Sequence, residues 1–380
     1  MAFYSEDFRL GVLGGGQLGR MLIQSATDYD IKVAVIDPSK MAPCRTLAHE
    51  FSVGDFSDYQ TVLDFGKGKD VLTIEIEHVN TDALRELQKQ GVKVFPQPDV
   101  LEIVKDKGLQ KQFYQDNGIA TSPFRLIDGK ADLKDNLDAF PCMQKLRTGG
   151  YDGRGVTALR SESDFEKAFD VPSVLEDFVD FEIEISVIIA RNEAGEIKTF
   201  PVVELEFNPE ANLVEFLVSP GRIAPDIAEK ARKLAIQVIE AFGMVGLLAV
   251  EMFVTKDGEV MVNEVAPRAH NSGHQTIEGN VTSQYEQHLR AILNLPLGET
   301  DTIQAAVMIN LLGEKGHVGP VKYNGMEEAL ALGGVHPHIY GKAHTKPFRK
   351  MGHVTITGKD VEKTIVKARK VMDMIKVEAY

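Results

Sequence analysis

The sequence predicts a protein of the α/β and α+β classes, with an open parallel α/β domain, a small domain carrying a glycine loop, and a larger C-terminal domain. Three observations support this prediction. Residues 10–38 read as strand, glycine turn, helix and strand, which is one βαβ unit. Residues 147–155, RTGGYDGRG, place four glycines among polar side chains. Residues 246–268 contain two alternating apolar runs around Asp257-Gly258, a strong hairpin signal.

The composition limits the class of protein. A chain of 380 residues that is 43% hydrophobic can bury several cores. Its formal net charge of −14 opposes binding to a polyanion, so we expect no nucleic-acid partner. Cys44 and Cys142 match no metal-ligand spacing and fit a reducing compartment. The N-terminus has no basic region followed by an apolar stretch, so we expect a cytoplasmic protein without a membrane partner.

The glycine turn of the first unit allows a different class of protein. Gly14, Gly16 and Gly19 satisfy the dinucleotide fingerprint, and Asp37 ends the second strand where a ribose-binding acid would lie. An NAD-dependent oxidoreductase or an NAD-binding module is therefore an alternative. The fingerprint by itself is weak, because glycines at this turn also serve strand-to-helix packing.

Three domains are expected, at residues 1–103, 104–181 and 182–380. Further strands at 71–79 and 91–98 complete the first domain. The chain from Asp99 to the stop at Gly118 is predicted to form one helix that leads into the second domain. Its residues Lys107 and Lys111 are four apart on one face, which is typical of a solvated stripe.

The loop at 147–155 combines glycines with two arginines. Glycine lets a main chain approach a ligand closely, and arginine offers a rigid fork for phosphate or carboxylate oxygens. An anion-binding loop is one interpretation, and a solvated turn is the other.

The hairpin predicts a metal site. If Asp257 and Gly258 form a two-residue loop, Glu251 faces Glu264 on the neighbouring strand. Opposed like charges are destabilising unless something compensates them, and Mg²⁺ carried with nucleotide phosphates suits an all-oxygen site. The prediction depends on the register, because a loop of odd length would put the two carboxylates on opposite faces.

Polar residues after the hairpin, and a basic group near the C-terminus, are further candidates. His270 and His274 have the spacing of a helical zinc pair, but Gly273 argues against a helix. We expect anion and polar-group binding instead of zinc there. The candidates are Arg268, His270 and Asn271, together with a basic group that could bind phosphate, Lys346, Arg349 and Lys350.

The segments GGGQLGRM, RTGGYDGRG, NEVAPRAHNSGH and SQYEQHLRAI resemble the ATP-grasp ligases. More narrowly, they are similar to the family of N5-carboxyaminoimidazole ribonucleotide synthetases, and the likeness runs across nearly the whole chain. The resemblance implies an ATP-grasp fold in which the first domain is the pre-ATP-grasp domain and the small domain a lid. It implies a carbon–nitrogen ligase in purine biosynthesis that makes carboxyphosphate from ATP and bicarbonate and carboxylates 5-aminoimidazole ribonucleotide. Another ATP-grasp carboxylase or formyltransferase, acting on a different amine, is the alternative within the fold.

The resemblance also implies the ATP and metal residues. ATP with Mg²⁺ is expected, with Mn²⁺ as a substitute metal, and Glu251 and Glu264 are the expected metal ligands. The implied ATP residues are Lys107, Lys145, Gly150, Tyr151, Asp152, Gly153, Arg154, Gly155, Val156, Glu176, Asp177, Phe178, Val179, Glu184, Asn263 and Glu264.

The same resemblance implies catalytic and ribonucleotide-binding residues, and a homodimer. The chain departs from the family at Phe207, where a polar element near the ATP edge is more usual. Asp152, Arg154, Arg268 and His270 are the implied catalytic residues. The implied ribonucleotide-binding residues are Gly16, Gln17, Glu75, Tyr151, Asp152, Arg154, Asn271, Lys346 and Arg349.

Overall fold

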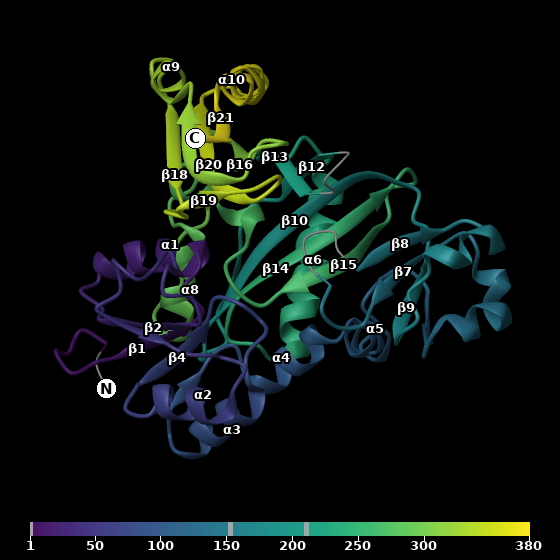
Figure 1. Cartoon of the computed structure of the whole chain (residues 1–380), viewed down its shortest axis with the longest axis horizontal. Coiled ribbons are helices and arrows are strands. Elements are labelled where there is room, and N and C mark those ends of the chain that lie inside the picture. The colour runs from purple at the N-terminus through teal and green to yellow at the C-terminus, as the bar shows by residue number, and fades with distance from the viewer. Residues whose placement is uncertain (1–2, 151–154, 209–212) are drawn as a thin grey trace.

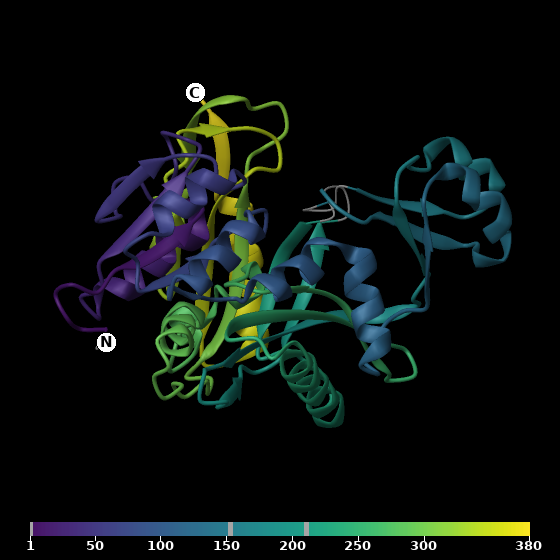
Figure 2. The ribbon, with the colours of Figure 1, turned by 90° about the horizontal axis from the view of Figure 1, so that it is seen from below.

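The computed structural model describes residues 3–150, 155–208 and 213–380. Figure 1 shows the N-terminal sheet, in purple, and a small blue-to-teal sheet at opposite ends of the long axis, with the central sheet between them. The C-terminal strands and helices, in green to yellow, lie above the N-terminal sheet, and β16, β20 and β18 continue the central sheet. In Figure 2 the small sheet projects away from the rest of the molecule. Inside the described ranges no helix is long and apolar enough to cross a membrane.

The N-terminal sheet is open and parallel, as predicted. Its strands lie in the order β3-β2-β1-β4-β5, and every printed pair is parallel. The apolar runs of β1, β2 and β4 are almost entirely buried, as expected for a sheet covered on both faces. The strands are β1 (Leu10–Leu13), β2 (Val33–Asp37), β3 (Glu50–Val53), β4 (Val71–Ile74) and β5 (Lys93–Val94), with helices α1 (Gln17–Thr27), α2 (Tyr59–Gly66) and α3 (Thr81–Lys89).

The helix predicted after residue 99 is in fact two helices, α4 (Pro98–Lys105) and α5 (Lys107–Asp116). Asp106 has extended backbone angles and separates them. Its carboxylate accepts hydrogen bonds from the amides of Gly108 (2.8 Å) and Leu109 (3.1 Å), so it is the N-cap of α5. The prediction of one helix was wrong because Asp106, in an extended conformation, ends the first helix and caps the second.

The small domain has a four-stranded sheet in the order β6-β9-β7-β8. Its printed strand pairs are antiparallel. Its apolar core is small and includes Ile127, Leu133, Leu159 and Leu175. The elements are β6 (Phe124–Ile127), β7 (Cys142–Leu146), β8 (Val156–Leu159) and β9 (Ser173–Asp177), with 3₁₀ segments η1 (Lys130–Ala139) and η2 (Glu162–Lys167).

The central sheet has the order β15-β14-β10-β12-β13-β16-β20-β18, and β11 pairs with β10. One face of β10, β14 and β15 packs on α6, in a core that contains Ile185, Val250 and Leu234. The opposite face is turned toward the first domain and the lid. The elements are β10 (Phe181–Arg191), β11 (Ile197–Thr199), β12 (Val203–Asn208), β13 (Leu213–Ser219), α6 (Pro225–Phe242), β14 (Gly246–Thr255) and β15 (Val260–Ala266).

The C-terminal part extends the same sheet and adds a three-stranded sheet, β19-β17-β21. A further core forms around Ile309, Val354 and Val371. The predicted boundaries at 103/104 and 181/182 stay predictions. The remaining elements are η3 (Asn271–Gly273), α7 (Thr276–Gly279), α8 (Gln284–Ile292), β16 (Ala305–Leu312), β17 (Gly319–Asn324), α9 (Met326–Leu330), β18 (Val335–Ile339), β19 (His344–Thr345), β20 (Lys350–Gly358), α10 (Val361–Met374) and β21 (Lys376–Ala379).

Candidate active site

The hairpin β14–β15 brings Glu251 opposite Glu264, as predicted. The loop differs from the prediction, because Thr255 and Glu259 close a loop of three residues, with Gly258 in the left-handed region (φ +76°). A β-bulge compensates: Glu251 pairs with Glu264, whereas Met252 pairs with Val262, so Asn263 is an extra residue on β15. The odd loop and the bulge cancel, and the two carboxylates remain opposed.

The bulge also turns two consecutive side chains toward the cleft. Asn263 contacts Lys145 and Glu184, while Glu264 contacts Lys107. Val262, two residues before Glu264, packs in the core beneath α6. A regular strand would have sent either Asn263 or Glu264 to that core, because side chains alternate in an unbulged strand.

The opposed carboxylates have very different proton affinities. The Lys107 ammonium lies 2.6 Å from Glu264 Oε2 and lowers the pKa of Glu264 to about 2. Burial, and then the Glu264 charge, raise the pKa of Glu251 well above its ordinary value. When no further cation is present, Glu264 is therefore ionised at neutral pH, whereas Glu251 holds its proton more strongly than an ordinary carboxyl. A divalent cation between them would let both ionise, so the pair could hold Mg²⁺.

The described residues offer no group of three or more His, Cys, Asp or Glu side chains arranged to hold a metal ion by themselves. Two carboxylates suit an ion that takes its other ligands from phosphate oxygens and water. His270 and His274 do not form a zinc pair, because η3 precedes His274 and its ring is held by Gln284 and Tyr285.

Lys145 lies beside the same pair. Its ammonium donates to Glu176 Oε2 (3.1 Å) and to Asn263 Oδ1 (3.0 Å). The Asn263 amide in turn donates to Glu184 Oε1 (3.3 Å). Burial, and then the nearby Glu264 charge, raise the pKa of Glu184 to about 7. The structure thus gathers five of the predicted ATP residues, Lys107, Lys145, Glu184, Asn263 and Glu264, around one point.

Lys111 was wrongly expected on a solvated face, because 2% of its side chain is exposed. Its ammonium donates to Thr121 Oγ1 (2.7 Å) and Ser122 Oγ (2.8 Å) and lies 3.2 Å from Glu176 Oε2. Helical spacing gave no signal for this burial, which depends on the docking of β9 beside α5. Glu176 therefore has two cations, and Lys111 remains its partner if Lys145 moves to a phosphate.

We expect the Michaelis constant for ATP to rise above about pH 8. Burial lowers the pKa of Lys111 to about 8, with the Glu176 charge acting in the opposite direction and Lys145 in the same one. Once Lys111 loses its proton, Lys145 is the remaining cation beside Glu176. The phosphates of ATP must then compete with Glu176 for the Lys145 ammonium. Lys111→Met should raise the constant about tenfold at pH 7, the effect of one charge-assisted hydrogen bond, and should remove the transition near pH 8. Steady-state kinetics between pH 6.5 and 9.5 measure both effects.

The control is Lys134→Met, which removes an exposed lysine from the same small domain. An ATP constant that stays flat through pH 8 in the wild type, or that is unchanged in Lys111→Met, would contradict the assignment.

Arg147 joins the lid to the start of α5. Its guanidinium donates to both oxygens of Asp106, with Nε 2.8 Å from Oδ1 and Nη2 2.7 Å from Oδ2. The amide of Lys107 donates to the Arg147 carbonyl (2.8 Å). A Cβ on Gly108 would lie 2.6 Å from Arg147 Nε, so only glycine permits this approach. The sequence gave no reason to single out this pair, whose members lie 41 residues apart.

The glycine loop is partly described. Gly149 (φ +77°) and Gly155 (φ +78°) adopt left-handed angles that favour glycine, and a Cβ on Gly155 would lie 2.9 Å from Leu146 Cδ1. Gly150 lines the cavity described below, and Val156 begins β8. The remaining candidates of this loop, Tyr151, Asp152, Gly153 and Arg154, lie outside the described residues.

The predicted ATP residues Glu176 to Val179 begin in the last two residues of β9 and continue into the connection to β10. Glu176 is turned inward to Lys111 and Lys145, whereas Asp177 and Phe178 are exposed and Val179 is half-buried. The amide of Asp177 donates to the carbonyl of Pro123 (3.0 Å). Because the side chains of Asp177 and Phe178 are exposed, these two residues are better placed to offer main-chain groups to a ligand than to enclose it with their side chains.

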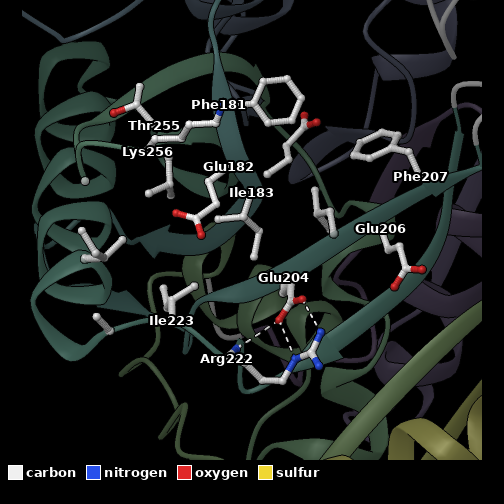
Figure 3. A pocket seen from close by; sticks show the side chains of 16 residues that line it. Phe181, Glu182, Ile183, Glu204, Glu206, Phe207, Arg222, Ile223, Thr255 and Lys256 are labelled. Atoms are coloured by element: carbon white, nitrogen blue, oxygen red, sulfur yellow. Dashed lines mark hydrogen bonds and ion pairs between the residues drawn. The ribbon is translucent and has the colours of Figure 1, made fainter.

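A pocket of about 770 Å³ opens where β10 and β12 separate, and Glu184 and Phe207 both line it. Figure 3 shows Phe207 and Glu206 on one side and Phe181, Glu182 and Ile183 on the other. At its floor Arg222 Nε donates to Glu204 (3.0 Å). Phe207 thus lines the same pocket as Glu184, and its position at the ATP edge stays a prediction.

The glycine turn of the first domain holds carboxylates of its own chain. The amides of Gly16 (3.1 Å) and Leu18 (3.2 Å) donate to Glu75, and the amide of Gly15 donates to Asp37 Oδ2 (2.8 Å). A Cβ on Gly16 would lie 2.3 Å from Glu75 Oε1. Burial raises the pKa of Glu75 to about 7. Amides that would bind a dinucleotide pyrophosphate are therefore already occupied, which removes the physical basis of the NAD alternative.

Residues after the hairpin reach the same region. Arg268 Nη2 lies 2.8 Å from Glu77 Oε1, and His270 Nδ1 lies 2.9 Å from Ser272 Oγ and 3.6 Å from Glu251 Oε1. The side-chain Nδ2 of Asn271 donates to Asn310 Oδ1 (2.9 Å). Arg268 is thus oriented by the first domain, and His270 lies beside the metal-site candidate.

A cavity of about 680 Å³ connects these residues across the first domain, the lid and the central sheet. Lys350, at the start of β20, lines it, but Lys346 and Arg349 are not among its lining residues. Lys346 is exposed, and Arg349 Nη1 donates to the His344 carbonyl (2.7 Å). The predicted site residues that do line the cavity are Gly16, Gln17, Glu75, Lys107, Gly150, Glu251, Glu264, Arg268, His270 and Asn271.

This cavity lies between a pre-ATP-grasp domain, a glycine-loop lid and a carboxylate-bearing hairpin, which defines an ATP-grasp ligase. Family models agree: residues 8–105 match the ribonucleotide synthetase preATP-grasp domain, and residues 112–285 match the ATP-grasp domain. Residues 306–367 match the phosphoribosylaminoimidazole carboxylase C-terminal domain.

The chain belongs to the family of N5-carboxyaminoimidazole ribonucleotide synthetases. It is 38% identical over 354 residues to the N5-carboxyaminoimidazole ribonucleotide synthase of Bacillus subtilis, covering 91% of this chain and 90% of that one. The synthetase structure from Thermotoga maritima superposes with a TM-score of 0.91 at 43% identity, covering 98% and 100% of the two chains.

A second solved relative carries ligands. The Aspergillus clavatus enzyme in complex with ADP and 5-aminoimidazole ribonucleotide has a TM-score of 0.88 at 32% identity, covering 97% of this chain and 98% of that one. The predictions of an ATP-grasp fold and of an ATP-dependent ligase are therefore confirmed, and the oxidoreductase alternative is set aside.

Proposed function

We propose that this chain carries out its family's reaction in the 680 Å³ cavity: ATP-dependent carboxylation of 5-aminoimidazole ribonucleotide by bicarbonate. The products are N5-carboxyaminoimidazole ribonucleotide, ADP and phosphate. The single observation that carries the proposal is the Glu251–Glu264 pair, which lines with Lys107 a cavity that three domains share. Phosphoryl transfer needs this concentration of opposed charge, because negative charge is spread over the transferred group in the transition state.

The proposed ATP site lies along the hairpin. Lys107 and Lys145 would bind phosphate oxygens, and Glu184 would accept hydrogen bonds from ribose hydroxyls. Main-chain groups between Glu176 and Val179 would read the base, and the glycine loop from Gly150 to Val156 would cover the phosphates. Mg²⁺ bound by Glu251 and Glu264 would neutralise phosphate charge; Mn²⁺ would fit the same oxygens.

The proposed bicarbonate and ribonucleotide sites lie on the first-domain side. Arg268 and His270 would hold bicarbonate and the carboxyphosphate formed from it. Gly16, Gln17 and Glu75 would form the wall against the ribonucleotide. Further proposed contacts are Tyr151, Asp152, Arg154, Asn271, Lys346 and Arg349, with Asp152 positioning the amine.

ADP formation tests this function. It should require bicarbonate and 5-aminoimidazole ribonucleotide together, and the carbamate should appear in equal amount. ATP hydrolysis that proceeds equally without the ribonucleotide would contradict the assignment of 5-aminoimidazole ribonucleotide as the substrate. The acceptor would then be a different amine.

We also propose a cytoplasmic homodimer, by analogy with the family and because both cysteines are free and buried. Light scattering should give twice the chain mass of 41.9 kDa. A monomer mass at micromolar concentration would refute the dimer.

A further inference from the structure

His274 lines the cavity and has no role in the function proposed so far. It follows the short segment η3 and is 1% exposed. Arg268, His270 and Lys350 line the same cavity, so His274 belongs to the end where an oxyanion is expected. The hydrogen bonds of its ring decide what it can offer there.

Nδ1 of His274 is an acceptor, because Gln284 fixes it. Gln284 Oε1 accepts from the His270 amide (2.9 Å), and Gln284 Nε2 donates to the His270 carbonyl (2.8 Å), so these two main-chain contacts set the orientation of the side-chain amide. The same Nε2 lies 3.1 Å from His274 Nδ1. An amide nitrogen can only donate, so Nδ1 carries no proton and the neutral ring carries it on Nε2.

Tyr285 and two further rings hold His274 in this state. The Tyr285 hydroxyl lies 3.0 Å from Nδ1, and because that nitrogen carries no proton the hydroxyl can act toward it only as a donor. The His274 ring stacks on His353 at 4.6 Å, and His353 stacks on His338 at 4.4 Å. Burial, and then the positive charges that His270, His338, Lys350 and Arg268 can carry, lower the pKa of His274 well below its ordinary value, so its ring is neutral at pH 7.

The free end of the ring is Nε2. Within the described part of the chain, no residue forms a hydrogen bond with Nε2 of His274. An N–H donor on a residue that is 1% exposed, on the wall of a cavity where we expect anions, is suited to a ligand.

This arrangement gives a role to Gly273, Gln284 and Tyr285, which the proposed function does not use. A Cβ on Gly273 would lie 2.4 Å from Gln284 Oε1, so NSGH requires its glycine for Gln284 to approach. Gln284 and Tyr285, in SQYEQHLRAI, are the residues that fix the His274 tautomer. Residues from NSGH and SQYEQHLRAI thus act together to fix the tautomer of His274.

We propose that His274 is a substrate-binding residue that donates from Nε2 to an oxygen of bicarbonate and of the carboxyphosphate formed from it. A neutral imidazole can hold an oxyanion without giving it a proton, so the bicarbonate oxygen remains an effective nucleophile. The inference rests on the proposed function for the identity of the anion, but the tautomer and the donor do not depend on it.

Nitrogen NMR of protein with ¹⁵N-labelled histidine tests the tautomer directly, with the His274 signals assigned by their loss in His274→Gln. We expect Nε2 to carry the proton throughout pH 6–8.5 and its resonance to shift when bicarbonate is added in the presence of Mg²⁺-ADP. The proposal would be overturned if Nδ1 carried the proton, or if the ring were an imidazolium at pH 7. It would also be overturned if the Nε2 resonance did not shift at saturating bicarbonate.

Kinetics separates binding from structure. His274→Phe keeps a planar ring but no donor, and should raise the Michaelis constant for bicarbonate about 10- to 100-fold, as for one hydrogen bond to a charged group, with the ATP constant within about twofold. His274→Gln, which restores an N–H, should recover most of the loss. An equal rise in both constants, or an unchanged bicarbonate constant, would refute the role.

His288→Gln is the matched control, because His288 is also buried, and bonds to Thr73 and Leu247, but does not line the cavity. It should leave the bicarbonate constant unchanged. If the wild type forms no ADP in response to the ribonucleotide, the proposed function fails, whereas the NMR result still decides the tautomer and the bicarbonate contact.

Discussion

Glu264→Gln is expected to reduce ADP formation about 100- to 1,000-fold at saturating substrates, the range found when one charged group that stabilises a transition state is removed. Glutamine has nearly the same shape but no charge. Lys107 Nζ, 2.6 Å from Glu264 Oε2, would lose its counter-ion, and only Glu251 would remain to hold the cation. Coupled assays of ADP release measure the rate, and Mn²⁺ titration followed by electron paramagnetic resonance measures metal affinity.

Glu264→Gln should also lower the stability of the unliganded protein above pH 4. Lys107 holds the folded-state pKa of Glu264 at about 2, below the unfolded value of about 4.3. The resulting stabilisation is present above about pH 4.3 and is lost as pH falls toward 2. Glu259→Gln, an exposed change on the same hairpin, is the control and should leave activity and stability unchanged. Activity within tenfold of the wild type would refute the metal role of Glu264.

Glu251→Gln should abolish activity to a similar extent but raise the stability of the unliganded protein. Burial and the opposing Glu264 charge raise the folded-state pKa of Glu251, so the folded protein holds a proton that the unfolded chain releases. Stability therefore falls as pH rises through the unfolded pKa of about 4.3. Glutamine removes this penalty, and each 1 kcal/mol gained would raise Tm by about 2–4 °C for domains of 150–250 residues.

Differential scanning calorimetry with and without Mg²⁺-ATP checks this second prediction. The Tm gain of Glu251→Gln should be present at pH 7, should shrink toward pH 4.5, and should be reversed by Mg²⁺-ATP, which stabilises only protein that binds it. A Tm at pH 7 equal to or below that of the wild type would show that the two carboxyls do not repel each other in the folded protein. The opposite stability effects of the two glutamine variants distinguish this account from a general loss of packing.

The sequence by itself was sufficient for features that depend on neighbours along the chain. The βαβ unit follows from apolar runs and a glycine turn. Alternation within one hairpin also predicted that Glu251 opposes Glu264, although the pair is opposed because the three-residue loop and the bulge at Asn263 cancel. The motif segments identify the family because they carry residue types in a fixed order. Short-range periodicity is readable in each case, since the partners lie within one supersecondary unit.

Only the tertiary structure decided which charges meet. The bulge at Asn263 turns two consecutive side chains toward the cleft. Asp106 interrupts the predicted helix and accepts hydrogen bonds from Arg147, which is 41 residues away in the chain. Lys111 is buried against Glu176. Glu75 accepts hydrogen bonds from the amides of a glycine turn whose sequence is typical of a dinucleotide-binding site. These contacts join segments that are far apart in the chain. Their energies come from desolvation and charge pairing between surfaces that exist only after the domains have packed, and no local pattern in the sequence encodes them.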